Sequence, residues 1–390
     1  MQTGFDRFIK NKNLWKALEN KRLAYLGNCA SVSHQLDHSF QILRQNTSLK
    51  FVCVFSPQHG WDSVEQANMI PSDDTVLQNI PVFSLYKNET RRMTSDQLNQ
   101  FDVLLIDLQD VGCRIYTFVA TMLYALESCA EHNKEVWVLD RPNPVGRTVE
   151  GSILNNNFQS VVGPWNLPMR YGLTLGELSQ MYVQKEKLNL TLQVIKIKNY
   201  KVNQGWPSDR TWIAPSPNMT DIECAQCYSG TVLLEGTNIS EGRGTTFPLK
   251  IFGFPNMQSD KIIKTMITLR EEWMKGCVLR VCSFKPVFDK FKDQICSAIQ
   301  IHVKNTAEFR PYRLISLFLK SVKKVHSDFD WTLPPPYEYE YEKQPIDILS
   351  GDSFLREWID NPNSAPEDLE KKLSTDEQNW KTLSYSYHLY

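Results

Sequence analysis

The sequence carries almost no net charge and no long apolar run. Its 390 residues include 43 Lys plus Arg against 44 Asp plus Glu, which gives a formal net charge of −1. This balance does not indicate binding to nucleic acid or to an anionic membrane, so an anionic ligand would have to be met by local arginines. No stretch of about 18 apolar residues occurs, and residues 1–21 contain no apolar segment of signal-peptide length. We therefore expect a cytoplasmic protein without a membrane partner.

Metal-binding and dinucleotide-binding signatures are also missing. The nine cysteines are an odd number scattered through apolar segments, which suits reduced thiols in a core better than disulfides. Cys224 and Cys227 have the spacing of half a metal or redox site, but no second pair of this kind and no nearby histidine accompany them. After the first predicted strand, residues 27–31 read GNCAS rather than GxGxxG. The sequence therefore predicts no metal, no dinucleotide and no other cofactor.

The first part of the chain alternates between apolar runs and helical patterns. Helical spacing is clearest over residues 117–132, where apolar side chains recur on one face. Strands without internal alternation that are separated by helices are typical of a parallel sheet covered on both faces. The apolar runs predict strands over residues 22–27, 51–55, 81–85, 103–108 and 135–140. This pattern favours an α/β fold with a Rossmann-like, mostly parallel sheet.

The alternation loosens past residues 150–151, which indicates that a second unit begins there. Thr174 and Glu177 form a capping-box signature at the start of a helix predicted over residues 173–184. Further patterns predict strands over 191–197 and 278–284 and helices near 260–274 and 311–323. We place the N-terminal domain at residues 1–160, the C-terminal domain at 161–390, and the active-site cleft between them.

Three polar loops directly follow predicted strands. They are residues 56–60 (SPQHG), 107–114 (DLQDVGCR) and 140–144 (DRPNP). In open parallel sheets ligands bind beyond the carboxyl ends of the strands, so we expect these loops to converge on one edge. His59 in the first loop could shuttle a proton or bind a ligand, although a histidine bonded to loop backbone is nearly as good an explanation. The prolines of the third loop predict a rigid site scaffold, or a loop that only ties itself together.

The most site-like stretch is residues 233–246 (LLEGTNISEGRGTT), which follows an apolar run over 231–234 that we interpret as a strand. Glu235 and Glu241 can act as acid, base or nucleophile, and Arg243 can hold an anionic group. The glycines of this stretch would let the backbone come close to a ligand. The structural alternative is a turn whose carboxylates pair with Arg243.

These loops support two different kinds of chemistry. In the first, paired carboxylates hydrolyse a glycosidic bond, one protonating the leaving oxygen while the other acts as nucleophile or activates water. In the second, arginines surround a phosphate or carboxylate and the acids only orient them. The candidate acids are Glu241, Glu235, Asp107 and Asp140, and the candidate arginines are Arg114, Arg141, Arg170 and Arg243. Sequence spacing does not separate these two hypotheses.

An ordered series of motifs resembles a known family. The motifs are FSPQHG (55–60), PVFSLY (81–86), DLQDVGCR (107–114), VLDRPNPVG (138–146), MRYGLTLGEL (169–178), SPNM (216–219) and LEGTNISEGRGTT (234–246). They succeed one another over nearly the whole chain. In this order they closely resemble the exo-β-N-acetylmuramidase family, which was long catalogued as a domain of unknown function and is now treated as a glycoside hydrolase family.

The resemblance implies a Rossmann-like N-terminal domain joined to a smaller α+β C-terminal domain, with the active site in the cleft between them. It also implies removal of N-acetylmuramic acid from the non-reducing end of peptidoglycan fragments, without a cofactor. The partner is then a small amino-sugar or peptidoglycan-fragment substrate, and the oligomeric state stays open. The lactyl carboxylate of that sugar gives an arginine-lined pocket a purpose. The matched motifs imply substrate contacts from Gln58, Arg114, Tyr116, Arg141, Asn143, Arg170, Asn218, Asn238 and Arg243. The catalytic candidates are Glu241, Glu235, His59, Asp107 and Asp140.

Two positions depart from the family pattern. The family loop SPEHG reads SPQHG here, so Gln58 stands where we expect a catalytic glutamate, and an amide cannot ionise. Tyr171 stands where the family usually has histidine. These departures indicate a divergent branch of the family.

Three hypotheses follow for the missing glutamate. In the first, Glu241 or Glu235 is the essential carboxylate and Gln58 only positions sugar. In the second, another acid such as Asp62 or Glu65 substitutes. In the third, the protein binds an amino sugar without cleaving it.

Overall fold

The computed structural model describes residues 1–66, 72–87, 91–334 and 340–390, and its larger unit is a seven-stranded sheet. The strands are β1 (Arg22–Gly27), β2 (Lys50–Ser56), β3 (Thr75–Leu77), β4 (Ile80–Ser84), β5 (Val103–Asp107), β6 (Glu135–Leu139) and β7 (Leu192–Ile195). They lie in the order β3-β4-β2-β1-β5-β6-β7, and every neighbouring pair is parallel except β3 and β4. The mostly parallel sheet and its five predicted strands, β1, β2, β4, β5 and β6, are confirmed.

Helices cover both faces of this sheet because successive residues of a strand point to opposite sides. In β1, Leu23 and Tyr25 pack with phenylalanines of α1 (Gly4–Lys10) and α3 (Ser39–Arg44). Ala24 and Leu26 of the same strand belong to a second core with α5 (Phe118–Glu131) and α6 (Leu175–Lys185). Two short helices, α2 (Lys12–Lys16) and α4 (Ser95–Leu98), complete this unit. The helices predicted over residues 117–132 and 173–184 are confirmed as α5 and α6.

Strand β7 completes the large sheet, although it lies after residue 160, the predicted domain boundary. Its residues pair in parallel with β6, from Leu192 opposite Val136 to Ile195 opposite Leu139. Helix α6 begins after Thr174 with the predicted capping box and makes the crossover from β6 to β7. A strand of four residues carries too little pattern to show which sheet it joins.

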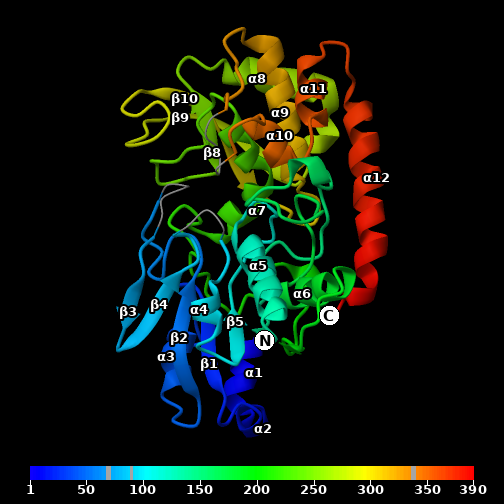
Figure 1. Cartoon of the computed structure of the whole chain (residues 1–390). Helices are drawn as coiled ribbons and strands as arrows, with labels where there is room; N and C mark the ends of the chain where they lie inside the picture. The colour runs from blue at the N-terminus through cyan, green and yellow to red at the C-terminus, as the bar shows by residue number, and fades with distance from the viewer. Residues whose placement is uncertain (67–71, 88–90, 335–339) are drawn as a thin grey trace.

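The second unit is a three-stranded antiparallel sheet packed against helices (Figure 1). Its strands β8 (Ile251–Phe254), β9 (Cys277–Phe284) and β10 (Cys296–Val303) lie in the order β8-β10-β9. Its helices are α7 (Ile222–Thr231), α8 (Ser259–Arg270), α9 (Pro311–Val325), α10 (Pro345–Ser350) and α11 (Phe354–Asp360). The predicted strand over 278–284 and the helices near 260–274 and 311–323 are confirmed.

The apolar run over residues 231–234 is helical, so the strand predicted there is wrong. Helix α7 continues directly into a 3₁₀ helix, Val232–Gly236. Short buried apolar runs have the same pattern in a helix as in a strand, and tertiary packing decides between them. Gly230 shows this packing, because a Cβ atom there would lie 2.1 Å from the carbonyl oxygen of Pro311 in α9. Only glycine lets the two helices approach so closely.

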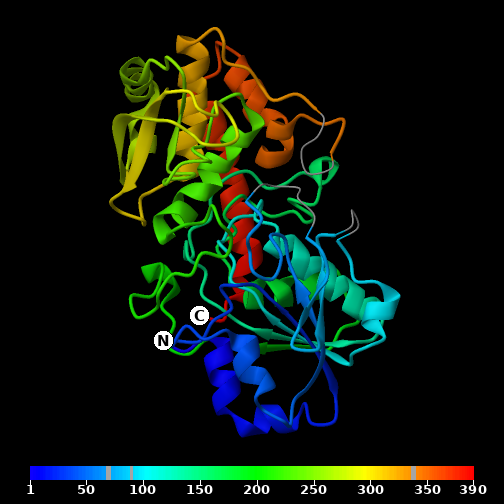
Figure 2. The same cartoon turned by 90° about the vertical axis from the view of Figure 1, so that its left-hand side faces the viewer.

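Helix α12 (Pro366–Ser384) fastens the two units together. Figure 1 shows it in red along one side of the molecule, past both units, and Figure 2 shows the C-terminus near the N-terminus. In its first half, Glu370 accepts two hydrogen bonds from Arg313 of α9. Near its end, Trp380 donates from Nε1 to the carbonyl oxygen of Tyr171, 2.7 Å away, and is 1% exposed. The placement of the second unit on the first therefore depends on this helix.

Replacement of Trp380 by alanine should lower the free energy of unfolding by about 3–5 kcal/mol, the usual cost of deleting a buried aromatic side chain. The variant also loses an edge-on contact with Trp165, at 6.1 Å between ring centroids. Urea denaturation followed by circular dichroism measures the change. The matched control is Tyr385→Ala, because Tyr385 is 75% exposed and should contribute less than about 0.5 kcal/mol. Equally small losses in both variants would contradict the fastening role of α12.

Candidate active site

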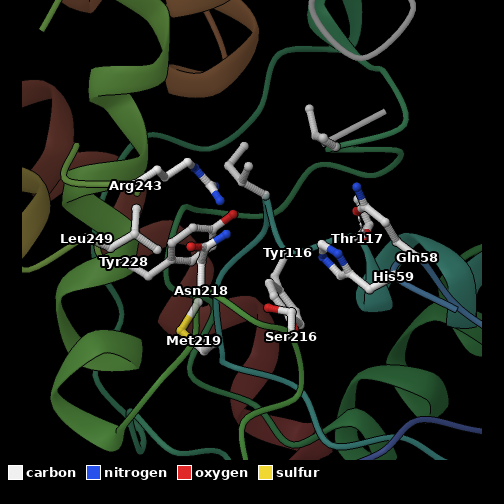
Figure 3. A pocket seen from close by; sticks show the side chains of 12 residues that line it. Gln58, His59, Tyr116, Thr117, Ser216, Asn218, Met219, Tyr228, Arg243 and Leu249 are labelled. Atoms are coloured by element: carbon white, nitrogen blue, oxygen red, sulfur yellow. Dashed lines mark hydrogen bonds between the residues drawn. The ribbon is translucent and has the colours of Figure 1, made fainter. Parts of the chain in front are cut away.

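A small polar pocket lies where the carboxyl end of the large sheet meets the second unit, and its empty space, including the solvent open to it, amounts to about 430 Å³. On the sheet side it is lined by Gln58 and His59, which follow β2, and by residues 115–117, which follow β5. On the other side the lining includes residues 216–219, Tyr228 of α7, Arg243 and Leu249. Figure 3 shows Arg243, Asn218 and Tyr228 across the pocket from Gln58 and His59. Of the three predicted polar loops, only residues 56–60 therefore line this pocket, together with residues 115–117, which follow the second predicted loop.

Gln58 presents an amide to the pocket. It is 4% exposed, and its Oε1 accepts a hydrogen bond of 2.6 Å from the hydroxyl of Thr117. Its Nε2 has no hydrogen-bond partner among the described residues. Because a buried amide nitrogen without a partner is costly, a ligand oxygen is a suitable acceptor for it.

His59 presents a neutral imidazole. Its Nδ1 lies 2.6 Å from the carbonyl oxygen of Glu65, so Nδ1 carries the proton and donates it, and Nε2 is left as an acceptor. Burial lowers the pKa of His59 from 6.5 to about 4, so the ring is uncharged at neutral pH. The residue also has a positive φ of 73°, which is uncommon outside glycine. The loop therefore fixes the ring with one nitrogen free for a ligand or a proton.

Arg243 is the cation of the pocket, and two glutamates hold it. Its Nη2 donates to Glu235 at 2.7 Å, and its Nε lies 3.1 Å from Glu241. Glu241 also accepts a hydrogen bond of 3.2 Å from Lys290. Burial disfavours the charge on Arg243, but Glu235 and Glu241 hold its pKa above the ordinary value. No hydrogen bond joins Nη1 to another described residue, and Figure 3 shows the guanidinium directed into the pocket.

The two acids beside Arg243 are not part of the pocket lining. Burial favours a protonated Glu241, but the charges of Lys290 and Arg243 outweigh it and lower the pKa of Glu241. Glu241 is therefore an ionised partner of Arg243 rather than a proton donor. Within the described part of the chain, no carboxylate lines the pocket, and Glu65 touches the site only through its main-chain oxygen.

Two tyrosines give the pocket aromatic walls. Tyr116, after β5, and Tyr228, in α7, meet edge to face with ring centroids 5.9 Å apart. Burial raises the pKa of both phenols well above the ordinary value, so both stay neutral. Asn218 also lines the pocket, and its Nδ2 donates to the carbonyl oxygen of Gln66. Neutral hydrogen-bonding groups on aromatic walls suit a polar, uncharged ring such as a sugar.

The third predicted loop does not reach the pocket. Asp107 accepts hydrogen bonds of 2.6 and 2.9 Å from Arg141, and both side chains are at most 5% exposed. Asp140 accepts from the hydroxyls of Thr174 and Tyr390, each at 2.7 Å, and burial raises its pKa to about 7. The N-terminus of α6 and the end of the chain cover this loop. Asp107, Asp140 and Arg141 are thereby bound to the protein itself, and the geometry does not support the catalytic or substrate contacts predicted for them.

Four other predicted substrate contacts also bind the chain itself. Arg114 is fully buried and donates to three main-chain carbonyl oxygens. Arg170 lies 3.7 Å from Glu150 and donates to a carbonyl oxygen at 2.9 Å. Asn143 and Asn238 each donate to a main-chain carbonyl at 2.8 Å. A buried guanidinium must satisfy its donors, and sequence alone does not reveal that main-chain carbonyls will do so.

Sequence reasoning missed Tyr228, Thr117 and Lys290. Tyr228 lies four residues after Cys224 on one face of α7, and this spacing was the available signal. Lys290 comes from the segment between β9 and β10, which carries no motif.

The predicted role of the glycines, to let the backbone approach a ligand, does not fit Gly242. A Cβ on Gly242 would lie 2.3 Å from the carbonyl oxygen of Ile251. This glycine admits a neighbouring chain segment rather than a ligand.

Neither a metal-binding cluster nor a membrane-spanning helix occurs among the described residues. In the ranges given above, no group of three or more His, Cys, Asp or Glu could hold a metal ion. Over the same residues no helix is long and apolar enough to cross a membrane.

The fold and the pocket define a two-unit α/β protein with a small polar pocket between its units. Comparisons with known proteins identify the family. The chain matches the exo-β-N-acetylmuramidase NamZ N-terminal domain over residues 23–223 and the C-terminal domain over 226–390. It is 33% identical over 386 residues to the peptidoglycan β-N-acetylmuramidase NamZ of Bacillus subtilis, which covers 98% of this chain and 90% of the relative. The chain therefore belongs to the NamZ family of hydrolases.

Solved structures agree with this assignment. Two DUF1343 family proteins from Bacteroides fragilis share the fold, with TM-scores of 0.86 and 0.72 at 28% and 26% identity. Each match covers 100% of this chain and 98% of the other. The predicted family and two-domain α/β fold are thus confirmed.

The neutral state of His59 predicts a pH dependence of stability. Its folded pKa of about 4 lies below the ordinary 6.5, so between these values the unfolded chain binds a proton that the folded chain does not. The stability that neutral His59 provides is therefore present above pH 6.5 and is lost as the pH falls to 4. Between pH 6.5 and 4, the free energy of unfolding should fall by roughly 3 kcal/mol more for the wild type than for His59→Asn.

Asparagine is the matched replacement, because it tolerates a positive φ and its amide can still donate to the carbonyl of Glu65. Urea titrations of both proteins at several pH values measure the difference. Parallel curves for the two proteins would contradict the buried, neutral assignment of His59.

Proposed function

We propose that this protein is an exo-acting glycoside hydrolase that releases N-acetylmuramic acid, or a related amino sugar, from the non-reducing end of peptidoglycan-type fragments. The observation that carries the proposal is Arg243, a buried cation fixed by two glutamates with one terminal nitrogen toward the pocket. N-acetylmuramic acid differs from N-acetylglucosamine by a lactyl carboxylate, which a guanidinium binds well. Membership of the NamZ family supports the same substrate class. A cytoplasmic place in the recycling of wall fragments belongs to this proposal.

Each lining group has a role in this proposal. Arg243 binds the lactyl carboxylate, and the unpartnered Nε2 of Gln58 donates to a sugar oxygen. Tyr116 and Tyr228 enclose the ring and exclude water from it. Neutral His59 holds a water molecule through Nε2 and takes a proton from it as the water oxygen bonds to the anomeric carbon.

The described lining offers no carboxylic acid to protonate the leaving oxygen. When the bond from the anomeric carbon to the leaving oxygen breaks, that oxygen must gain a proton, and a carboxylic acid normally supplies it. Among the described lining residues, Gln58 presents an amide where the family pattern has a carboxylic acid. The leaving oxygen therefore takes its proton from solvent, and His59 later releases to solvent the proton that it took from the attacking water. A substrate whose leaving oxygen needs no proton should therefore react more readily than a natural disaccharide.

A second candidate function is amino-sugar binding without turnover. The observation that favours it is the same lack of a carboxylate among the described lining residues. A protein of this kind would bind the sugar saturably and release no product.

The two functions are separated by assays with nitrophenyl N-acetylmuramide and the matching glucosaminide between pH 4 and 9. Hydrolysis should favour the muramide by about tenfold or more, because only that sugar carries the carboxylate for Arg243. Gln58→Glu supplies a carboxyl group, so it should accelerate release from a muramyl disaccharide more than release of nitrophenol.

Calorimetry with N-acetylmuramic acid measures sugar binding directly, and the melting temperatures of the wild type and of Gln58→Glu are the folding control. Saturable binding without release of either sugar would replace hydrolysis with the binding function. Preference for the glucosaminide would remove muramic acid from the proposal.

Glu241→Gln tests whether that carboxylate positions Arg243 or takes part in the chemistry. If it positions the guanidinium, the change should raise the KM for the muramide by about tenfold, the cost of weakening one charged contact, with a much smaller effect on kcat. The glucosaminide, which offers Arg243 no carboxylate, is the matched control substrate and should respond less. A fall of about a hundredfold in kcat for both sugars at unchanged KM would instead make Glu241 a catalytic group.

A further inference from the structure

A second and larger cavity opens beside the pocket, over the small antiparallel sheet. Its empty space, including the solvent open to it, amounts to about 1480 Å³, against about 430 Å³ for the pocket on the same measure. Residues 280–288, from the end of β9 onward, contribute one wall, and residues 244–248 contribute another. We call this cavity the β9 groove. Its size exceeds what one sugar ring needs, and none of the roles described above uses it.

The β9 groove adjoins the pocket. Asn218 lines both cavities. A single loop also serves both, because Arg243 and Leu249 at its ends face the pocket while residues 244–248 between them face the groove. A ligand that extends beyond the pocket on this side therefore enters the β9 groove.

The loop between the two cavities is fixed in place. Gly244 has a φ of +75°, and a Cβ atom there would lie 2.6 Å from the carbonyl oxygen of Phe288. The backbone of Val287 donates to the carbonyl oxygen of Gly244 at 2.9 Å. Glycine is thus required for this close approach, which holds the wall of the groove against the segment after β9. The groove is therefore a built feature rather than a gap under a loose loop.

The chemistry of the β9 groove is cationic and aromatic. Arg280 and Lys285 line it, and no Asp or Glu does so among the described residues. Arg280 donates to Gln300 at 3.0 Å, which orients the guanidinium, and no ion pair joins either cation to a described carboxylate. Phe247 and Phe284 supply apolar surface beside these charges. This combination suits a ligand with a ring face and a negative charge.

We infer that the β9 groove binds the leaving portion of the substrate, an amino-sugar ring followed by a carboxylate-bearing muramic acid residue. This inference rests on the proposed function, because an exo-acting enzyme holds the terminal sugar in a closed pocket and the rest of the chain must leave through an open side. Arg280 and Lys285 bind the second carboxylate, and the phenylalanines contact the intervening ring. The groove thus sets a preference for anionic fragments longer than a disaccharide.

The test measures binding of a sulfur-linked MurNAc–GlcNAc–MurNAc trisaccharide, which resists hydrolysis, against free N-acetylmuramic acid by calorimetry. The wild type should bind the trisaccharide about tenfold or more tightly than the monosaccharide. The double variant Arg280→Gln with Lys285→Gln should lose most of that advantage. Amidation of the lactyl carboxylate on the reducing-end MurNAc should weaken binding to the wild type but change little for the double variant, because amidation and the double substitution remove the same interaction.

The matched control is Lys275→Gln with Lys304→Gln, which removes two exposed charges of the same unit outside the groove. It should keep the full advantage of the trisaccharide. If the wild type binds both ligands equally, or if the control loses as much as the groove variant, the inference fails while the proposed function stands. If N-acetylmuramic acid itself does not bind, the proposed function fails first and the inference fails with it.

Discussion

The candidate site depends on how a buried arginine is held. A guanidinium that is 8% exposed must have its charge and donors satisfied, and Glu235 and Glu241 do this, while Lys290 pairs with Glu241. The four side chains carry two positive and two negative charges, so the network is internally balanced. Arg243 can therefore meet a carboxylate without first losing a partner, and the two acids are committed to holding it. Glu235 and Glu241 hold Arg243 and do not line the pocket, so Arg243 is available to bind the anionic sugar of the proposed function.

The second constraint is the amide at position 58. In the family pattern this loop ends in Glu-His-Gly. Here the amide of Gln58 lies beside neutral His59, whose Nδ1 donates to a main-chain carbonyl and whose Nε2 is an acceptor. Recognition and proton transfer are thereby separated in this protein. Arg243, the tyrosines and Asn218 can select a sugar, while His59 is the one side chain of the described lining suited to accept a proton. The chemistry available therefore favours substrates with a good leaving group.

Helix α12 and the C-terminal residues explain why the third polar loop is not part of the site. The loop after β6 lies under the start of α6 and the last residue of the described chain, where Tyr390 bonds Asp140. The same C-terminal segment positions the second unit through Trp380 and Glu370. Residues that look like site components at the end of a strand are thus used to fasten the two units in the geometry that forms the pocket.

The family, the parallel sheet and the first loop of the site could be predicted from the sequence alone, because each of these rests on local pattern. Apolar runs define buried strands, and motif order defines the family. Only the tertiary structure decided that β7 joins the large sheet and that residues 231–234 are helical. It also decided that Arg114, Arg141 and Arg170 bind the chain while Arg243 faces a pocket. All four arginines have the same chemistry in the sequence. What separates them is which carbonyls and carboxylates packing brings within hydrogen-bond distance, and that depends on contacts between residues far apart in the chain.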